Sequence, residues 1–375
     1  APTITQLTLN GQAAASTTTY TVGDAVLLDI AARDTRGDAA NTAGPVTAIR
    51  VYENGSLVKS GSGGTLNVDL SKTAAGAARA DGLKIENVTI DHGRAKADAL
   101  NTNGSGGGIR NRGHLDAMNL IVGACASDGR GGGISNSGMM NLANSQVVDN
   151  ASRTDAGGGL YNDGELVVAI SQIAANTAND GGGLDNVGGK VRIVDSTFSG
   201  NKATGGIGGA IRNAGKDAAL TIVNSTFNSN VGQKQGGGLA NFAPATADLN
   251  NATFAQNASG DGGGIASDKA AGVTLSNTIL STNTAGPGGA ADCKGAVTSR
   301  GHNLVGKPGG CDFHAQGDLL GKDPKLGPLA ANDGPTRTRA LLDGSPAIGG
   351  GSPKDPDGKD GACAPADQRG VKRPQ

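Results

Sequence analysis

Short segments in which apolar and polar residues alternate recur along the chain. They include 139–145 (MMNLANS), 165–171 (ELVVAIS), 190–196 (KVRIVDS), 219–225 (ALTIVNS) and 273–278 (VTLSNT). Alternation with a period of two is typical of a β-strand with one buried and one exposed face. A large α/β enzyme would instead contain long amphipathic helical stretches, so the pattern predicts an all-β chain.

A glycine-rich element separates these strands at a steady interval. Gly-Gly-Gly or Gly-Gly-Ala, followed by Ile or Leu, recurs every 24 to 28 residues, beginning at Gly106, Gly131, Gly157, Gly181, Gly208, Gly236 and Gly262. Two residues after the Ile or Leu, six of these copies carry an asparagine: Asn111, Asn136, Asn162, Asn186, Asn213 and Asn241. A second motif places apolar residues between two asparagines, as in Asn224, Phe227 and Asn230.

The interval of this repeat selects the architecture. Ankyrin and tetratricopeptide repeats are longer and helical, and propeller blades need about 40–50 residues. A unit of about 26 residues with short strands fits one coil of a parallel β-helix. We therefore expect about eight to nine coils, which at ~4.8 Å per coil form a rod of roughly 40 Å. Stacking aligns equivalent asparagines, so the six asparagines after the glycine-rich elements are predicted to form a structural ladder.

Composition agrees with a narrow, sharply turning coil. The chain contains 65 Gly among 375 residues, but only eight aromatic residues and no Trp. Glycine suits corners that need positive φ or close backbone approach, and a narrow interior favours small side chains. Phe198, Phe227 and Phe254 occupy equivalent positions in successive repeats. We expect them to stack inside the coil rather than to bind a ligand.

Charge and the chain start narrow the function classes. The formal net charge is −1 and no basic stripe is present, which argues against a nucleic-acid partner. No apolar run approaches the ~20 residues of a membrane-spanning helix. The sequence begins at Ala1 without Met, which suits a mature exported protein whose signal peptide has been removed.

Three regions are expected. Residues 1–80 contain ordinary strands and a hairpin signal at Asn54-Gly55, and resemble a short immunoglobulin-like module. A complete sandwich needs about seven strands, so this segment is either a cap over the first coil or an incomplete sandwich that accepts a strand from another copy. Residues 81–292 hold the coils, and residues 293–375 close the β-helix.

The third region contains a set of recognisable motifs. They are SRGHNL at 299–304, LGPL at 326–329, NDGPT at 332–336, GSPAI at 344–348 and DQRG at 367–370. With the preceding repeats, this set resembles the choice-of-anchor Q family of secreted bacterial right-handed parallel β-helix proteins. The resemblance covers residues 82–375 and implies export and a right-handed coil. No sorting tail follows Pro374-Gln375, which argues against covalent or membrane anchoring.

Four cysteines fit an exported protein and allow three pairings. We favour Cys293–Cys311, which would close the loop at the end of the helix, and the family resemblance supports it. Cys125 replaces a repeat asparagine and Cys363 lies near the C-terminus. Because these two would lie far apart along a rod, free thiols or an intermolecular bridge are both open.

Catalytic and metal signals are sparse. Asp155, Asp180 and Asp261 precede glycine corners and are equally explained as corner residues, and the four histidines show no ligand spacing. The motifs of pectin hydrolases are absent. Asp355, Asp357 and Asp360 resemble a short calcium loop without the glutamate that completes an EF-hand. Calcium is the one cofactor considered, and a solvated turn is the alternative.

The sequence thus predicts a secreted, non-catalytic protein of the cell surface or extracellular matrix. It would act as an adhesin or as a self-assembling filament subunit, associating head to tail through its N-terminal β segment. A cell-surface polysaccharide is the other partner considered. The alternative is a polysaccharide lyase or glycoside hydrolase, which would need clustered carboxylates on adjacent coils.

Overall fold

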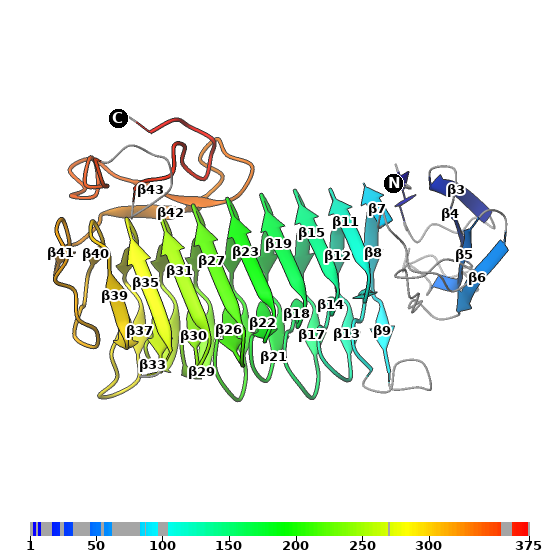
Figure 1. Ribbon diagram of the computed structural model, residues 1–375, viewed down its shortest axis with the longest axis horizontal. Coiled ribbons are helices and arrows are strands. Elements are labelled where there is room, and N and C mark those ends of the chain that lie inside the picture. The colour runs from blue at the N-terminus through cyan, green and yellow to red at the C-terminus, as the bar shows by residue number, and fades with distance from the viewer. Residues whose placement is uncertain are drawn as a thin grey trace, which may run out of the picture.

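A computed structural model describes residues 89–96, 104–268, 271–353 and 362–373 in full, and before residue 89 the backbone of strands β1 to β8. Four parallel sheets wind about one axis into a β-solenoid of about eight coils (Figure 1). No α-helix occurs in this described part of the chain. The predicted all-β parallel β-helix is therefore confirmed.

Each complete coil contributes one strand to each sheet, and sheets 1 and 2 continue at both ends. Sheet 1 contains β1 (Thr3–Ile4), β7 (Leu83–Glu86), β11 (His114–Met118), β15 (Met139–Ala143), β19 (Glu165–Ala169), β23 (Lys190–Val194), β27 (Ala219–Val223), β31 (Thr246–Asn250), β35 (Gly272–Ser276) and β39 (Val297–Ser299). Sheet 2 contains β2 (Leu7–Thr8), β8 (Val88–Asp91), β12 (Ile121–Gly123), β16 (Gln146–Val148), β20 (Gln172–Ala174), β24 (Thr197–Ser199), β28 (Thr226–Asn228), β32 (Thr253–Ala255), β36 (Ile279–Ser281), β40 (Leu304–Val305) and β41 (Leu319–Leu320).

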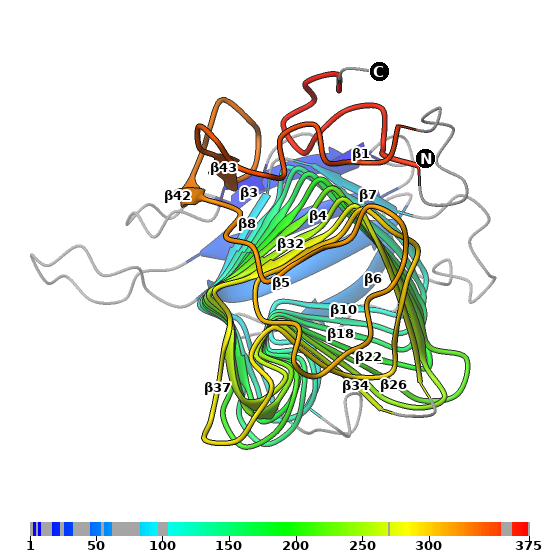
Figure 2. The same cartoon turned by 90° about the vertical axis from the view of Figure 1, so that its left-hand side faces the viewer.

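The other two sheets complete the coil on either side of the glycine-rich corner. Sheet 3 contains β9 (Arg94–Ala95), β13 (Ala126–Ser127), β17 (Ala151–Ser152), β21 (Thr177–Ala178), β25 (Lys202–Ala203), β29 (Val231–Gln235), β33 (Ala258–Asp261) and β37 (Thr284–Ala285). Sheet 4 contains β10 (Ile109–Asn111), β14 (Ile134–Asn136), β18 (Leu160–Asn162), β22 (Leu184–Val187), β26 (Ile211–Ala214), β30 (Leu239–Asn241), β34 (Ile265–Ser267) and β38 (Cys293–Gly295). Figure 2 shows the four sheets along the solenoid axis.

The glycine corners are required by the closeness of neighbouring coils. Gly157 has φ +71°, a left-handed conformation that glycine adopts without strain. A Cβ on Gly158 would lie 2.5 Å from the carbonyl oxygens of Gly182 and Thr177. Only glycine fits there, which explains why the element recurs in every coil.

Two ladders of buried asparagines connect the coils. In the ladder predicted from the sequence, the side-chain amide of each asparagine from Asn111 to Asn213 donates to the next amide oxygen at 2.7–2.8 Å. A second ladder runs between sheets 2 and 3 through Asn150, Asn176, Asn201, Asn230, Asn257 and Asn283. Cys125 occupies the equivalent position one coil before Asn150, and its backbone N–H donates to Asn150 Oδ1. These asparagines have a structural role, because their side-chain amides are hydrogen-bonded inside the coil.

The core is filled by the inward residues of the sheets. Phe198, Phe227 and Phe254 are fully buried, and their rings stack with centroids 5.1 and 4.4 Å apart. The predicted internal aromatic stack is confirmed. Such pairs contribute about 0.5–1.5 kcal/mol beyond the burial of their surface.

The far end of the solenoid is closed by the chain itself. Cys293 and Cys311 form a disulfide with Cα atoms 5.9 Å apart, as favoured from the sequence. Residues 306–318 connect β40 to β41 across this end, and Phe313 within them is buried in the core (Figure 2). The apolar interior at this end therefore does not depend on a second molecule for cover.

The N-terminal region contributes strands to the solenoid and to a separate sheet. β1 pairs in parallel with β7 and β2 pairs in parallel with β8, so these two short strands extend sheets 1 and 2. The separate sheet is antiparallel and contains β3 (Thr17–Val22), β4 (Val26–Ala32), β5 (Val46–Glu53) and β6 (Ser56–Gly61). Glu53 pairs with Ser56, as the hairpin signal predicts. The immunoglobulin-like assignment and strand exchange stay predictions.

After β41 the chain turns back along the outside of the solenoid. An antiparallel pair, β42 (Leu326–Ala330) and β43 (Thr338–Leu341), lies over the outer face of sheet 2 and crosses several coils (Figure 1). Residues 342–353 and 362–373 continue over the same face. We call residues 326–353 and 362–373 the C-terminal return.

Candidate functional site

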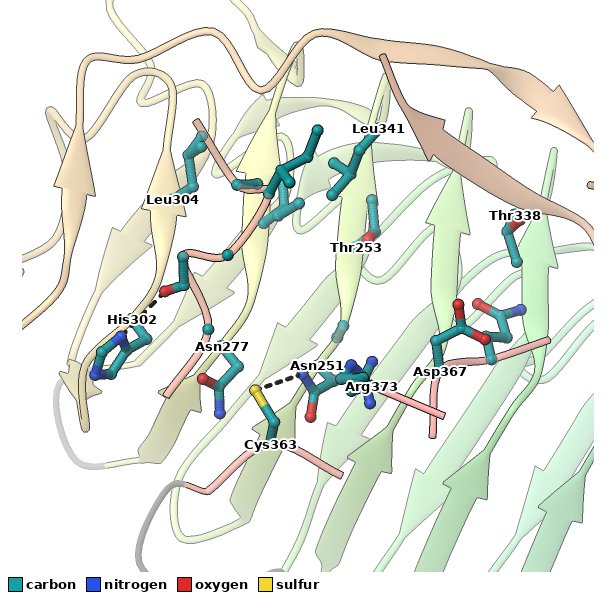
Figure 3. Close-up of a pocket in the computed structure, with 18 of the residues that line it drawn as sticks. Asn251, Thr253, Asn277, His302, Leu304, Thr338, Leu341, Cys363, Asp367 and Arg373 are labelled. Carbon is teal, nitrogen blue, oxygen red and sulfur yellow. Dashed lines mark hydrogen bonds between the residues drawn. The ribbon is translucent and has the colours of Figure 1, made fainter. Parts of the chain in front are cut away.

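A groove of about 770 Å³ lies between sheet 2 and the C-terminal return (Figure 3). Its floor consists of outward residues of β28, β32, β36 and β40, and its walls come from the return. Ligand sites are typically clefts of about 300–1,000 Å³ with a few convergent polar groups. We therefore take this groove as the candidate functional site.

The sequence of sheet 2 changes where the groove begins. The outward row reads Ile121, Gln146, Gln172, Thr197, Thr226, Thr253, Ile279, Leu304 and Leu319. Ile121 is 40% exposed, whereas Thr197, Thr226 and Leu304 are at most 3% exposed because the return covers them. Along this row, long polar side chains give way to short threonines and then to apolar residues. This change is the sequence signal that could have indicated a covered surface here.

Gln368 fixes the return to the sheet. Its amide donates to Thr197 Oγ1 at 3.1 Å, to Thr336 Oγ1 at 2.9 Å and to the Ser196 carbonyl at 3.2 Å. Its amide oxygen accepts from Thr226 Oγ1 at 2.7 Å. Gln368 and Thr336 belong to two of the motifs singled out in the sequence, so these motifs meet on the coil surface.

We expect Gln368→Ala to loosen the return without unfolding the coils. The substitution leaves buried hydroxyl and carbonyl groups without their partner, which should cost about 1–3 kcal/mol. Limited proteolysis with mass spectrometry should show faster cleavage within residues 322–373, while residues 104–268 stay protected. Gln146→Ala, an exposed glutamine on the outward row of sheet 2 beyond the groove, is the control. Equal cleavage of both variants would contradict the role assigned to Gln368.

The groove is rich in cations. Its lining holds four basic residues, Arg339, Arg369, Lys372 and Arg373, against the single carboxylate of Asp367 among the described lining residues. Arg369 binds that carboxylate through Nε at 3.0 Å and Nη2 at 2.6 Å. Burial alone would raise the pKa of Asp367, but the bonds from Arg369 and backbone N–H groups outweigh it and lower the pKa.

Two of these arginines donate to neutral oxygens. Arg339 donates to the Gly327 carbonyl at 2.8 Å and to Asn228 Oδ1 at 3.1 Å. Arg373 donates to Asn224 Oδ1 at 3.0 Å and to the Ala364 carbonyl at 2.7 Å. Burial lowers the pKa of both guanidinium groups from the ordinary value. Both guanidinium groups are therefore fixed in place by neutral oxygens, and Arg373 also lies within electrostatic reach of the carboxylates of Asp367 and Asp195.

Neither remaining cysteine is paired. Cys363 lines the groove, where its sulfur accepts from Asn251 Nδ2 at 3.6 Å (Figure 3). Cys125 is buried in the core, and burial raises the pKa of its thiol to about 12. A thiol that stays protonated is a poor nucleophile, so Cys125 fills space in place of an asparagine.

A second polar cluster lies on sheet 4 beneath the corner loops. Tyr161 and Asp185 are neighbours on β18 and β22, and they are 5% and 1% exposed. Arg130 donates to the Tyr161 hydroxyl at 2.7 Å, and Arg212 donates to Asp185 at 3.2 Å. Burial raises the pKa of Asp185 to about 7, although Arg212 and Arg130 act in the opposite direction. The sequence pattern did not indicate this cluster, because outward positions in a coil are expected to be exposed to solvent.

The three corner aspartates each have a bonding partner, and two of them, Asp155 and Asp180, also lie close enough to Asp185 to raise its pKa. Asp155 accepts from Arg130 at 3.0 Å, Asp180 accepts from the Ile207 N–H at 2.8 Å, and Asp261 pairs with Lys294. Each of these contacts stabilises a corner, which is the role of corner residue that the sequence also allowed. The calcium candidates Asp355, Asp357 and Asp360 lie outside the described residues. Within the described ranges, no group of three His, Cys, Asp or Glu residues is arranged to hold a metal ion.

Of the four histidines, His302 is the one that lines the groove. Its Nδ1 lies 3.0 Å from the Gly350 carbonyl, and this contact ties the His302 ring to a wall of the groove (Figure 3). In the described part of the chain, no helix is long and apolar enough to cross a membrane. Comparison of the chain with protein-family models, with curated proteins and with solved structures gives no match.

Proposed function

We propose that the protein is an exported, non-catalytic protein of the cell surface or extracellular matrix, of the adhesin or structural class. The observation that carries the proposal is the groove on the flank of a rigid rod. Its walls are fixed by Gln368 and the arginines, and its charge is cationic. Such a surface suits holding a polymer.

The same groove is poorly suited to cutting one. Glycoside hydrolysis uses two carboxyl groups about 5–10 Å apart, and a calcium-dependent lyase needs several carboxylates beside its base. The described lining offers Asp367, which is tied to Arg369. Asp185, the described acid with the most clearly raised pKa, is covered on sheet 4. The lyase or hydrolase alternative has less support for these reasons.

Export is supported by the disulfide between Cys293 and Cys311, since such bonds persist in oxidising compartments. The resemblance to the choice-of-anchor Q family points the same way and stays a prediction. Head-to-tail filaments also stay a proposal. Because Phe313 already covers the core at the C-terminal end of the solenoid, a filament contact at that end would have to use surfaces other than open apolar coil.

The experiment is a combined binding and cleavage assay on the purified protein. Polygalacturonate, alginate and neutral dextran are incubated with it, with and without calcium. Reducing ends and unsaturated uronates measure cleavage, and co-sedimentation measures retention. We expect retention on at least one polymer without new chain ends. Cleavage of any polymer would overturn the non-catalytic proposal, and no retention on any of them would remove the adhesin class.

Negative-stain microscopy at high protein concentration tests the filament form of the proposal. Rods joined end to end are expected for a self-assembling subunit. Single rods alone at every concentration would leave the adhesin form and exclude the filament form.

A further inference from the structure

We propose that the groove under the C-terminal return is a binding site for an acidic, carboxylate-bearing polysaccharide. The inference rests on the proposed non-catalytic function and adds the site and the ligand class. It starts from the four basic residues of the lining, Arg339, Arg369, Lys372 and Arg373, against one carboxylate, Asp367, among the lining residues that the structure describes. A cleft of one sign with protein walls concentrates the field and attracts ions of the opposite charge.

The arginines are preorganised for this role. Arg339 and Arg373 are held by carbonyl and amide oxygens rather than by carboxylates, so their positions are fixed while their charge is not neutralised by contact. Their pKa values are lowered by burial, which marks partial removal of water from the guanidinium groups. An arriving carboxylate would meet cations that have already lost part of their hydration. Charge-assisted bonds are the strong ones in such surroundings.

Lys372 adds a mobile cation at the rim. It is exposed, it lines the groove, and its neighbours Val371 and Arg373 belong to the tail of the return. A lysine on a flexible stem can follow the carboxylates of a polymer without a fixed geometry. It therefore offers a charge that can be removed without disturbing the hydrogen bonds that hold the return.

The rest of the lining suits a sugar chain. Half-buried Thr253 contributes a hydroxyl group to the lining, and Leu341 lies near it (Figure 3). Ile279, Leu341 and Ile348 offer apolar surface for the faces of sugar rings. Leu341 is 39% exposed and Ile348 is 59% exposed. The mixture of a few polar groups with apolar surface is typical of small-molecule and polymer sites.

The open part of the floor is short. The return covers Thr226 and Leu304, so the floor that a ligand can reach consists of Thr253 and Ile279, in two adjacent coils about 4.8 Å apart. A short stretch of the polymer would therefore contact the floor. A single-stranded nucleic acid fits less well, because the described lining contains no aromatic side chain on which bases could stack and the chain has a net charge of −1.

The test uses Lys372→Glu and Lys372→Gln in the full chain. Fluorescence anisotropy with labelled oligogalacturonate at low salt measures affinity. We expect about tenfold weaker binding for Lys372→Glu and a smaller loss for Lys372→Gln, as the loss or reversal of one charge-assisted contact predicts. Lys202→Glu, an exposed lysine on sheet 3, makes the same charge change away from the groove and should leave affinity unchanged.

The outcomes separate this inference from the proposed function. Binding by the wild type that Lys372→Glu and Lys372→Gln leave intact would overturn the groove as the site, while retention without cleavage would still support the function. Equal binding of neutral dextran would overturn the acidic ligand class. Stronger binding of oligo(dT) than of oligogalacturonate would assign the groove to nucleic acid instead. Dextran sulfate as competitor separates carboxylate from sulfate polymers.

Discussion

Phe227→Ala is expected to lower the free energy of unfolding of the solenoid by about 3–5 kcal/mol. The ring of Phe227 lies between those of Phe198 and Phe254, at 5.1 and 4.4 Å, and it is fully buried. Removing it leaves a cavity that the neighbouring coils cannot close, because the second asparagine ladder bonds Asn230 to Asn201 on one side and to Asn257 on the other and so holds the coil spacing. The cost is therefore expected near the upper end for a buried aromatic residue.

Urea unfolding followed by circular dichroism measures this change. Because each coil of a solenoid contacts mainly its neighbours, the loss should be greatest in the coils around β28, and hydrogen exchange should rise there first. Thr221→Ala, an outward position on β27 in the same coil, should change stability by no more than about 0.5 kcal/mol. A loss below about 1 kcal/mol for Phe227→Ala would mean that the aromatic stack does not support the coil.

The coils could be predicted from the sequence because their contacts are local and repeated. Asn136 bonds to Asn162, 26 residues later, and the next pair lies at nearly the same separation. A period in the sequence therefore maps directly onto a contact in space. The same argument placed the three phenylalanines in one stack, since equivalent positions in successive coils must touch.

The C-terminal return could not be predicted in this way. Thr226 bonds to Gln368 and Thr336 bonds to the Asp195 carbonyl, contacts between residues about 140 positions apart that occur once. Because these contacts do not repeat, no period in the sequence indicates them. The motifs containing Gln368 and Thr336 were noticed as a resemblance, but only the fold shows that they lie against the threonines of sheet 2. The candidate groove depends on that docking, so the sequence alone did not reveal it.

The cluster around Asp185 was missed for a different reason. Alternation assigns Tyr161 and Asp185 to the outward face, and outward residues of a strand are usually solvated. The corner loops fold over this part of sheet 4, with Arg130 from one corner reaching the Tyr161 hydroxyl. Burial of an outward residue therefore depends on loop conformation, which the strand pattern does not describe.

Asp185→Asn is expected to remove a pH dependence from the stability of the solenoid. The Asp185 carboxyl is 1% exposed, and burial raises its pKa from 3.8 to about 7 against the attraction of Arg212 and Arg130. The folded chain therefore binds this proton more tightly than the unfolded chain does. Between pH 3.8 and about 7, the wild type loses stability as the pH rises, because folding must hold a charge that burial disfavours.

The size of the effect follows from the shift. One pKa unit corresponds to about 1.4 kcal/mol, so the wild type should lose roughly 2–3 kcal/mol relative to Asp185→Asn between pH 5 and pH 8. An asparagine keeps the shape and can still accept from Arg212, but it carries no titrating proton. Urea unfolding of both proteins at pH 5, 6, 7 and 8 measures the difference.

Asp248→Asn provides the matched control, since Asp248 pairs with Arg300 on the exposed face of sheet 1 and is 51% exposed. The difference in the free energy of unfolding between Asp248→Asn and the wild type should stay nearly constant across the same pH range, because surface ion pairs contribute little to stability. A constant difference for Asp185→Asn as well would show that the carboxyl of Asp185 is ionised in the folded protein throughout this range. Arg212 would then compensate the buried charge of Asp185 fully, and the two residues would form an ion pair in the folded protein instead of a contact with a neutral carboxylic acid.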